Sequence, residues 1–96
     1  MPTPTPETSV NFVTFIYTLA SNAAVHFGDV PEPGATETRA PNLAAAQHVI
    51  GLLAMLEEKT RGNLTPEERQ FLDQVLYELR MRYVAATAPK GRIVEP

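Results

Sequence analysis

Apolar residues recur at helical spacing in three segments of this chain. Over residues 10–27, 43–60 and 66–87 they return every three or four positions, which is the period of one face of an α-helix. A stretch with three prolines and two glycines, residues 28–41, separates the first two segments and cannot form regular structure. The pattern therefore predicts an all-α, three-helix domain over residues 9–87.

The boundary between the second and third helices is marked by residues that suit helix ends. Gly62 fits the left-handed conformation that closes a helix. Thr65 is a good N-cap, Pro66 suits the first helical position, and Glu68 stands where a capping box requires it. Because only a few residues join the two helices, we expect an antiparallel hairpin with the first helix packed on it.

The first predicted helix, residues 10–27, contains no Asp, Glu, Lys or Arg. We expect Ser9 or Thr8 to cap it and Gly28 to end it. Its apolar residues share one wide arc and predict a core face: Phe12, Val13, Phe15, Ile16, Leu19, Ala20, Ala23 and Phe27. Its uncharged polar residues lie opposite and form the first candidate association surface: Asn11, Thr14, Thr18 and Asn22.

An uncharged helix of this length is also compatible with a membrane, because a span needs about 20 apolar residues. The segment is rich in Ala, Thr, Ser and Asn, whereas a lipid-facing helix carries more Leu, Ile and Val and has charged flanks. A helix covered by protein on both faces is therefore the favoured interpretation, and membrane association is the third-ranked hypothesis.

The third predicted helix has two apolar stripes. The main stripe, centred on Leu72 and Leu76, predicts the core face. A second patch of Tyr77, Met81 and Val84 has no evident use within one chain. Two interpretations stay open: single apolar residues are common on protein surfaces, or the patch is a second association surface.

Composition bounds the size of the core. Prolines gather near both ends and in the long loop, so we expect a disordered arm at residues 1–8 and a flexible tail at 88–96. A domain this small supplies about 3–5 kcal/mol of net stability, and it often needs a disulfide, a metal or oligomerisation. Because the chain has no cysteine, we expect oligomerisation to complete the core, with a dimer favoured, or a protein partner to do so.

Charge and composition also limit the partners. The net charge of −3 provides no basic face for nucleic acid. The first apolar segment is not preceded by Lys or Arg, so a secretory signal is not expected. The lack of cysteine fits a reducing compartment, and we expect the cytoplasm.

Residues for chemistry are few. His26 lies on the apolar side of the first helix and is the one weak ligand candidate, whereas His48 lies on a polar face. We expect no catalytic residues, no cofactor and no metal site, because no ligand set or catalytic motif has a recognisable spacing. The charged residues are spaced as ordinary helix-stabilising i, i+4 pairs: Glu57 with Arg61, Arg69 with Asp73, and Glu78 with Arg82.

Three segments of the chain resemble a known bacterial family, the domain of unknown function 1844. They are NFVTFIYTLASNAAVHFG, APNLAAAQHVIGLLAMLEEKTRGNLTPEE and LYELRMRYV, and the block LLAMLEEKTRGNLTPEE is the most specific part. The resemblance covers about residues 10–87 and implies a short helical domain with no assigned activity or catalytic residues. In the family pattern Lys and Asp often stand where this chain has Gln47 and Gly51.

We therefore expect a non-enzymatic module for protein–protein interaction or oligomerisation. The alternative is a small-ligand-binding or enzyme accessory subunit with a pocket between the first helix and the hairpin, near His26.

Overall fold

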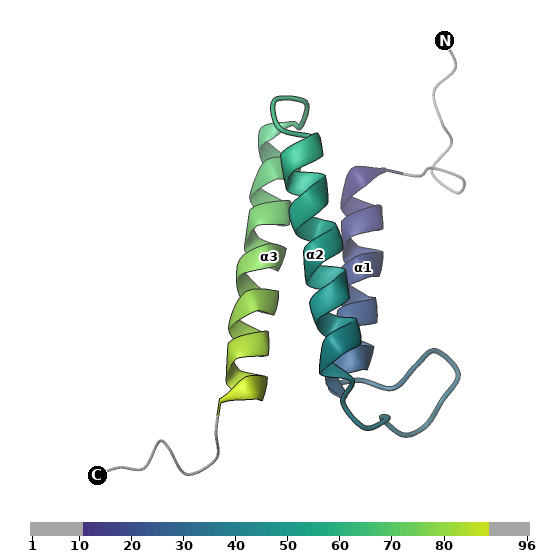
Figure 1. Ribbon diagram of the computed structural model, residues 1–96. Coiled ribbons are helices and arrows are strands. Elements are labelled where there is room, and N and C mark those ends of the chain that lie inside the picture. The colour runs from purple at the N-terminus through teal and green to yellow at the C-terminus, as the bar shows by residue number, and fades with distance from the viewer. Residues whose placement is uncertain (1–10, 89–96) are drawn as a thin grey trace.

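The computed structural model describes residues 11–88, which form three helices (Figure 1). They are α1 (Phe12–Phe27), α2 (Leu43–Lys59) and α3 (Pro66–Thr87), and no strand occurs in the described range. Each helix packs against both others, and α2 and α3 run antiparallel across a short turn. The predicted all-α domain, with one helix on a helical hairpin, is confirmed. The predicted arm and tail lie outside the described residues, apart from Ala88.

Helix α1 begins two residues later than the apolar pattern predicted. Its N-cap is Asn11, whose side-chain oxygen accepts a hydrogen bond from the backbone N–H of Thr14 at 2.8 Å. The prediction of a cap at Ser9 or Thr8 is therefore wrong. Asn is as good a cap as Ser or Thr, so local sequence does not decide between neighbouring candidates.

The end of α1 is a glycine-closed turn that fixes the start of the long loop. Gly28 has φ +81°, and its N–H donates to Val25 while that of Asp29 donates to Ala24. These two bonds satisfy carbonyls that a helix end otherwise leaves unpaired. A Cβ at Gly28 would lie 3.0 Å from the Arg39 carbonyl oxygen, so the returning loop also needs the glycine here.

The α2–α3 turn follows the sequence signals closely. Gly62 has φ +87°. The Thr65 hydroxyl accepts the Glu68 N–H at 3.1 Å, and the Glu68 carboxylate accepts the Thr65 N–H at 2.9 Å. This reciprocal capping box, with Pro66 at the first helical position, defines where α3 starts.

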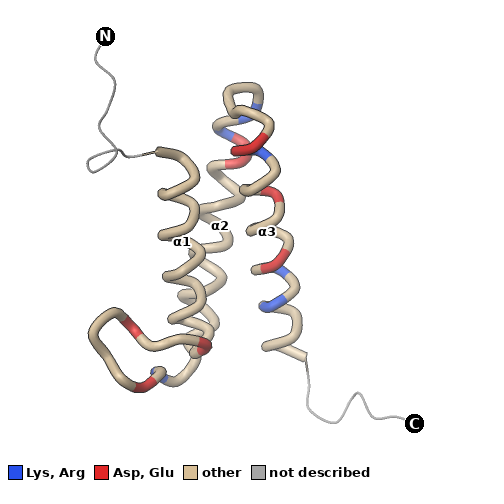
Figure 2. The backbone as a smooth tube through the Cα atoms, turned by 180° about the vertical axis from the view of Figure 1, so that it is seen from behind, with Lys and Arg blue, Asp and Glu red and all other residues tan. Residues whose placement is uncertain are grey.

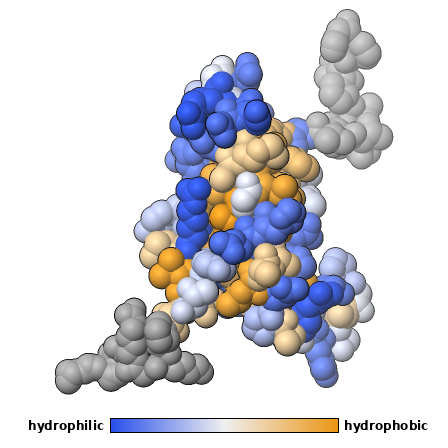
Figure 3. Space-filling view, in the orientation of Figure 1, coloured by the Kyte–Doolittle hydropathy of each residue, from blue (hydrophilic) through white to orange (hydrophobic). Residues whose placement is uncertain are grey.

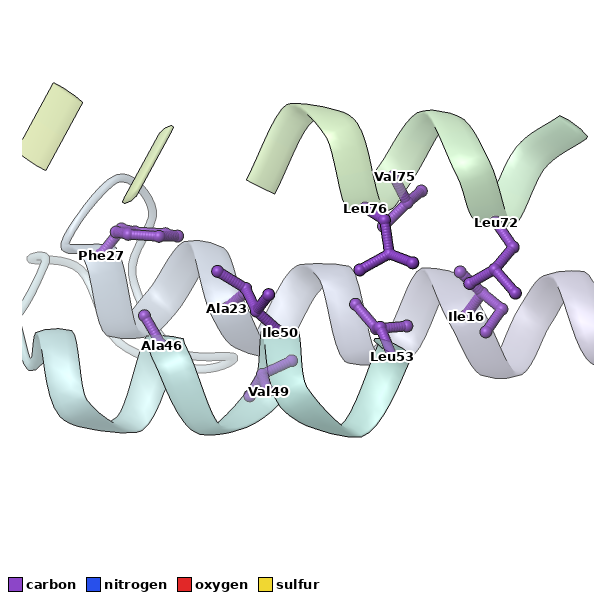
Figure 4. Packing of buried hydrophobic residues seen from close by; sticks show 10 residues of the cluster. All are labelled: Ile16, Ala23, Phe27, Ala46, Val49, Ile50, Leu53, Leu72, Val75 and Leu76. Carbon is purple, nitrogen blue, oxygen red and sulfur yellow. The ribbon is translucent and has the colours of Figure 1, made fainter. Parts of the chain in front are cut away.

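The core is one small apolar cluster in which all three helices take part (Figure 4). Its three largest fully buried side chains are Ile16 from α1, Leu53 from α2 and Leu72 from α3. The buried set comprises Ile16, Ala23, Phe27, Ala46, Val49, Ile50, Leu53, Leu72, Val75 and Leu76. No polar or charged side chain of the described residues is fully buried in it.

Two residues assigned to the core face of α1 are on the surface instead. Val13 is 39% exposed and Phe15 is 44% exposed. The buried residues of α1, namely Ile16, Ala23 and Phe27, fall on a narrower stripe than the apolar arc. The apolar arc of α1 is therefore wider than the part of its circumference that α2 and α3 cover.

We predict that Leu53→Ala lowers the free energy of unfolding by about 2–5 kcal/mol, because the side chain is fully buried and leaves a cavity. Met55→Ala on the same helix is the matched control, since Met55 is 44% exposed, and should change stability by less than about 0.5 kcal/mol. Urea unfolding followed by circular dichroism measures both. Equal losses for the two variants would contradict this core.

Candidate association surface

The exterior of α3 carries a group of exposed apolar residues, which we call the α3 patch: Tyr77, Met81 and Val84. Their exposed fractions are 64%, 50% and 58%. With about 100° between successive residues of a helix, the three share one face, opposite the buried Leu72 and Leu76. The structure thus gathers the α3 patch on one surface and gives it no role in the core.

The predicted polar residues of α1 also lie on the surface, and Figure 2 shows that α1 carries no charged residue. Asn11, Thr14, Thr18 and Asn22 are all exposed. The Thr18 hydroxyl donates to the Thr14 carbonyl at 3.0 Å, and the side-chain oxygen of Asn11 is used in capping. A partner could therefore cover much of this face without leaving those groups unpaired.

The sequence interpretation missed other exposed apolar residues on the first two helices. Phe15 and Tyr17 on α1 are 44% and 64% exposed, and Met55 on α2 is 44% exposed. Figure 3 shows hydrophobic residues, interrupted by hydrophilic ones, on the face between the hydrophilic turn and the hydrophilic loop. No hydrogen bond or ion pair of the described residues joins the α1 polar face to the α3 patch.

His26 is partly buried near the C-terminal end of α1. Its Nδ1 atom is shielded from solvent and has no hydrogen-bond partner among the described residues. Its carbonyl oxygen accepts the N–H of Asn42 at 2.7 Å, which ties the loop end to α1. In the described part of the chain, no group of three or more His, Asp or Glu residues could hold a metal ion.

A shallow cavity of about 300 Å³ lies between α2 and α3, away from His26. Its lining comprises Glu57, Asp73, Leu76, Tyr77 and Arg80, with no residue from α1. Tyr77 belongs to the α3 patch, so this cavity adjoins the candidate surface rather than the site predicted near His26. The interhelical spacing of Glu57 and Asp73 could not be inferred from either helix alone.

The two carboxylates that line this cavity, Glu57 and Asp73, are both paired with arginines. Arg61 donates to both carboxylate oxygens of Glu57, at 2.8 and 3.3 Å, and Arg69 lies 3.6 Å from the same group. Arg69 also donates to Asp73 at 3.1 Å. The hydrogen bonds from Arg61 lower the pKa of Glu57. The predicted pairs Glu57–Arg61 and Arg69–Asp73 are confirmed.

The predicted pair of Glu78 with Arg82 is wrong. Arg82 instead donates to both carboxylate oxygens of Asp29, at 2.8 and 2.6 Å, and its guanidinium lies 4.9 Å from the centre of the Phe27 ring. Glu78 accepts a hydrogen bond from Gln74 at 3.2 Å. Because the loop after α1 brings Asp29 beside α3, a bidentate partner distant in sequence replaces the one on the same helix.

The comparisons with known proteins identify a family for this chain. No helix in the described residues combines the length and apolarity that a membrane span requires. These residues form a small all-α domain in which one helix packs on a helical hairpin. The profile of the domain of unknown function DUF1844 matches residues 9–85, so the chain belongs to that family. No curated protein and no solved structure matches the chain.

We predict that Asn11→Ala lowers the free energy of unfolding by about 0.5–2 kcal/mol through loss of the α1 cap. Asn22→Ala on the same face is the control: it should be neutral or slightly stabilising, because Ala is the better helix former. Thermal or urea unfolding measures both. Equal effects of the two variants would show that Asn11 does not cap the helix.

The Asp29–Arg82 pair predicts a pH dependence on the acid side. The hydrogen bonds from Arg82 hold the pKa of Asp29 below its unfolded value of about 3.9. The unfolded chain therefore binds the proton first, and the stabilisation is complete above that value and is lost as pH falls through the lower, folded pKa. Because both side chains are more than a third exposed, screening limits the contribution to less than about 1 kcal/mol.

Unfolding of wild type and Asp29→Asn from pH 7 to pH 2 tests this prediction. The difference in stability between the two proteins should be present at pH 7 and should disappear at the acid end. A difference that stays constant with pH would mean that the pair does not contribute through its charge.

Proposed function

We propose that this domain is a non-enzymatic protein–protein association module that works as a homo-oligomer, with a dimer favoured. The observation that supports this proposal is the number of large apolar side chains left in solvent. Eight are exposed in the described residues: Val13, Phe15, Tyr17, Val30, Met55, Tyr77, Met81 and Val84. The buried core contains only ten residues, and two of these are alanines. The number of large apolar side chains that are exposed is therefore similar to the number that are buried.

The residue types on the α1 polar face and in the α3 patch favour a protein partner on these surfaces. Met and Tyr are enriched in the cores of protein–protein interfaces, where charged residues are depleted. The α3 patch contains both types, and the α1 face has no charge to desolvate. We also propose that the protein works in the bacterial cytoplasm. Its lack of cysteine favours a reducing compartment, and the family resemblance favours a bacterial source.

A small-ligand-binding subunit is the second candidate. The unpartnered Nδ1 of His26 favours it, because a buried polar atom without a partner is costly unless something binds to it. It ranks lower because the cavity between α2 and α3 contains no residue of α1.

We predict that wild-type protein at high micromolar concentration has a mass above that of the monomer in light scattering coupled to size exclusion. Met81→Glu should weaken this association about tenfold or more, because it places a charge in the α3 patch. Val30→Glu is the matched control: Val30 is 41% exposed, close to the 50% of Met81, but lies in the loop outside both candidate faces.

Both variants should keep the thermal stability of the dissociated chain, since neither side chain is in the core. A wild-type protein that stays monomeric at every concentration would exclude self-association. Equal weakening by the two variants would show that the effect of Met81→Glu is general charge repulsion and not loss of a contact.

A further inference from the structure

The α3 patch is part of a longer uncharged stripe, which we call the α3 seam: Gln70, Gln74, Tyr77, Met81 and Val84. Successive members are spaced four, three, four and three residues apart, which is the spacing of a coiled-coil contact. All five residues are exposed. At about 100° per residue they lie within one arc of about 80°, opposite the core.

The two edges of the α3 seam differ in charge. One edge carries Asp73 and Arg80, seven residues apart. The corresponding positions of the other edge carry Glu78 and Ala85. Residues at such flanking positions set the partner and the orientation of paired helices.

Orientation decides which edges meet. When two antiparallel helices are related by a twofold axis, the Asp73–Arg80 edge of one helix lies beside the same edge of the other. The two edges run in opposite directions, so the order of Asp73 and Arg80 is reversed in the second copy. Asp73 of each copy then lies beside Arg80 of the other, and two attractive pairs form. Two parallel helices instead place unlike edges together, and Asp73 would lie beside Glu78 of the other copy, which is repulsive.

We propose that the occupant of the α3 seam is a second copy of this chain, in an antiparallel α3–α3 contact with a twofold axis near Tyr77. The inference deepens the proposed function and rests on it. In this register the two Tyr77 side chains meet at the axis, and Met81 packs beside Gln70 and Gln74 of the second copy. Such an isologous contact closes as a dimer.

The charges within one copy agree with this arrangement. Asp73 is paired with Arg69, and Glu57, which faces the same cavity from α2, is paired with Arg61 and Arg69. Arg80 has no carboxylate at ion-pair distance among the described residues, although it lies near enough to Glu57 to contribute to lowering the pKa of that residue. The second copy thus supplies Arg80 with a partner at the rim of an apolar contact.

A charge exchange between two variants tests the contact. Asp73→Arg alone places Arg beside Arg80 of the other copy, and Arg80→Asp alone places Asp beside Asp73, so each should raise the dimer dissociation constant about tenfold or more. An equimolar mixture of the two variants restores both attractive pairs in the heterodimer. Its dissociation constant should return to within about threefold of the wild-type value.

Sedimentation equilibrium of the full chain over a concentration series measures these constants, and thermal melts of the dissociated variants confirm that they fold. Failure of the mixture to associate would overturn the antiparallel contact. A wild-type dimer that neither variant weakens would overturn this contact alone, and the proposed association would stand on another face. A wild-type monomer would overturn both.

Discussion

One apolar cluster joins the three helices, and its largest fully buried side chains come one from each helix: Ile16, Leu53 and Leu72 (Figure 4). The other buried residues belong to the same cluster. Because a helix buries only the stripe that faces its neighbours, three helices around one small cluster leave most of each circumference outside. The small core and the apolar exterior are thus two consequences of the same geometry.

Local rules account for the parts of the fold that were predictable from sequence. The turn from α2 to α3 follows from Gly62, Thr65, Pro66 and Glu68, since each of these residues acts within a few positions of itself. The short turn then requires the antiparallel hairpin. The bounds of α2 and α3 were predictable for the same reason, to within one residue.

Features that depend on distant segments were not predictable in this way. The pairing of Arg82 with Asp29 requires the path of the loop, which no helical spacing contains. Val13 and Phe15 are apolar and lie on α1 as predicted, but their burial depends on how much of the circumference of α1 is covered by α2 and α3. The cavity beside Glu57 combines residues of two helices and has no signature in either. The residues of the α3 patch, by contrast, could be named beforehand because they lie opposite the core stripe of their own helix.

Polar contacts at the end of the bundle opposite the α2–α3 turn position the part of α3 that carries the α3 patch. Towards its C-terminal end α3 diverges from α2 (Figure 1). There Arg82 is held by Asp29 and by the Phe27 ring, and the Tyr83 hydroxyl donates to Gln47 at 3.4 Å. These bonds orient the part of α3 that carries Met81 and Val84, while the outward direction of both side chains follows from their position on the helix. Since these bonds join α3 to Asp29 and to α2, whereas Met81 and Val84 are exposed on the opposite side of the helix, the end of α3 can be fixed in place without covering its surface.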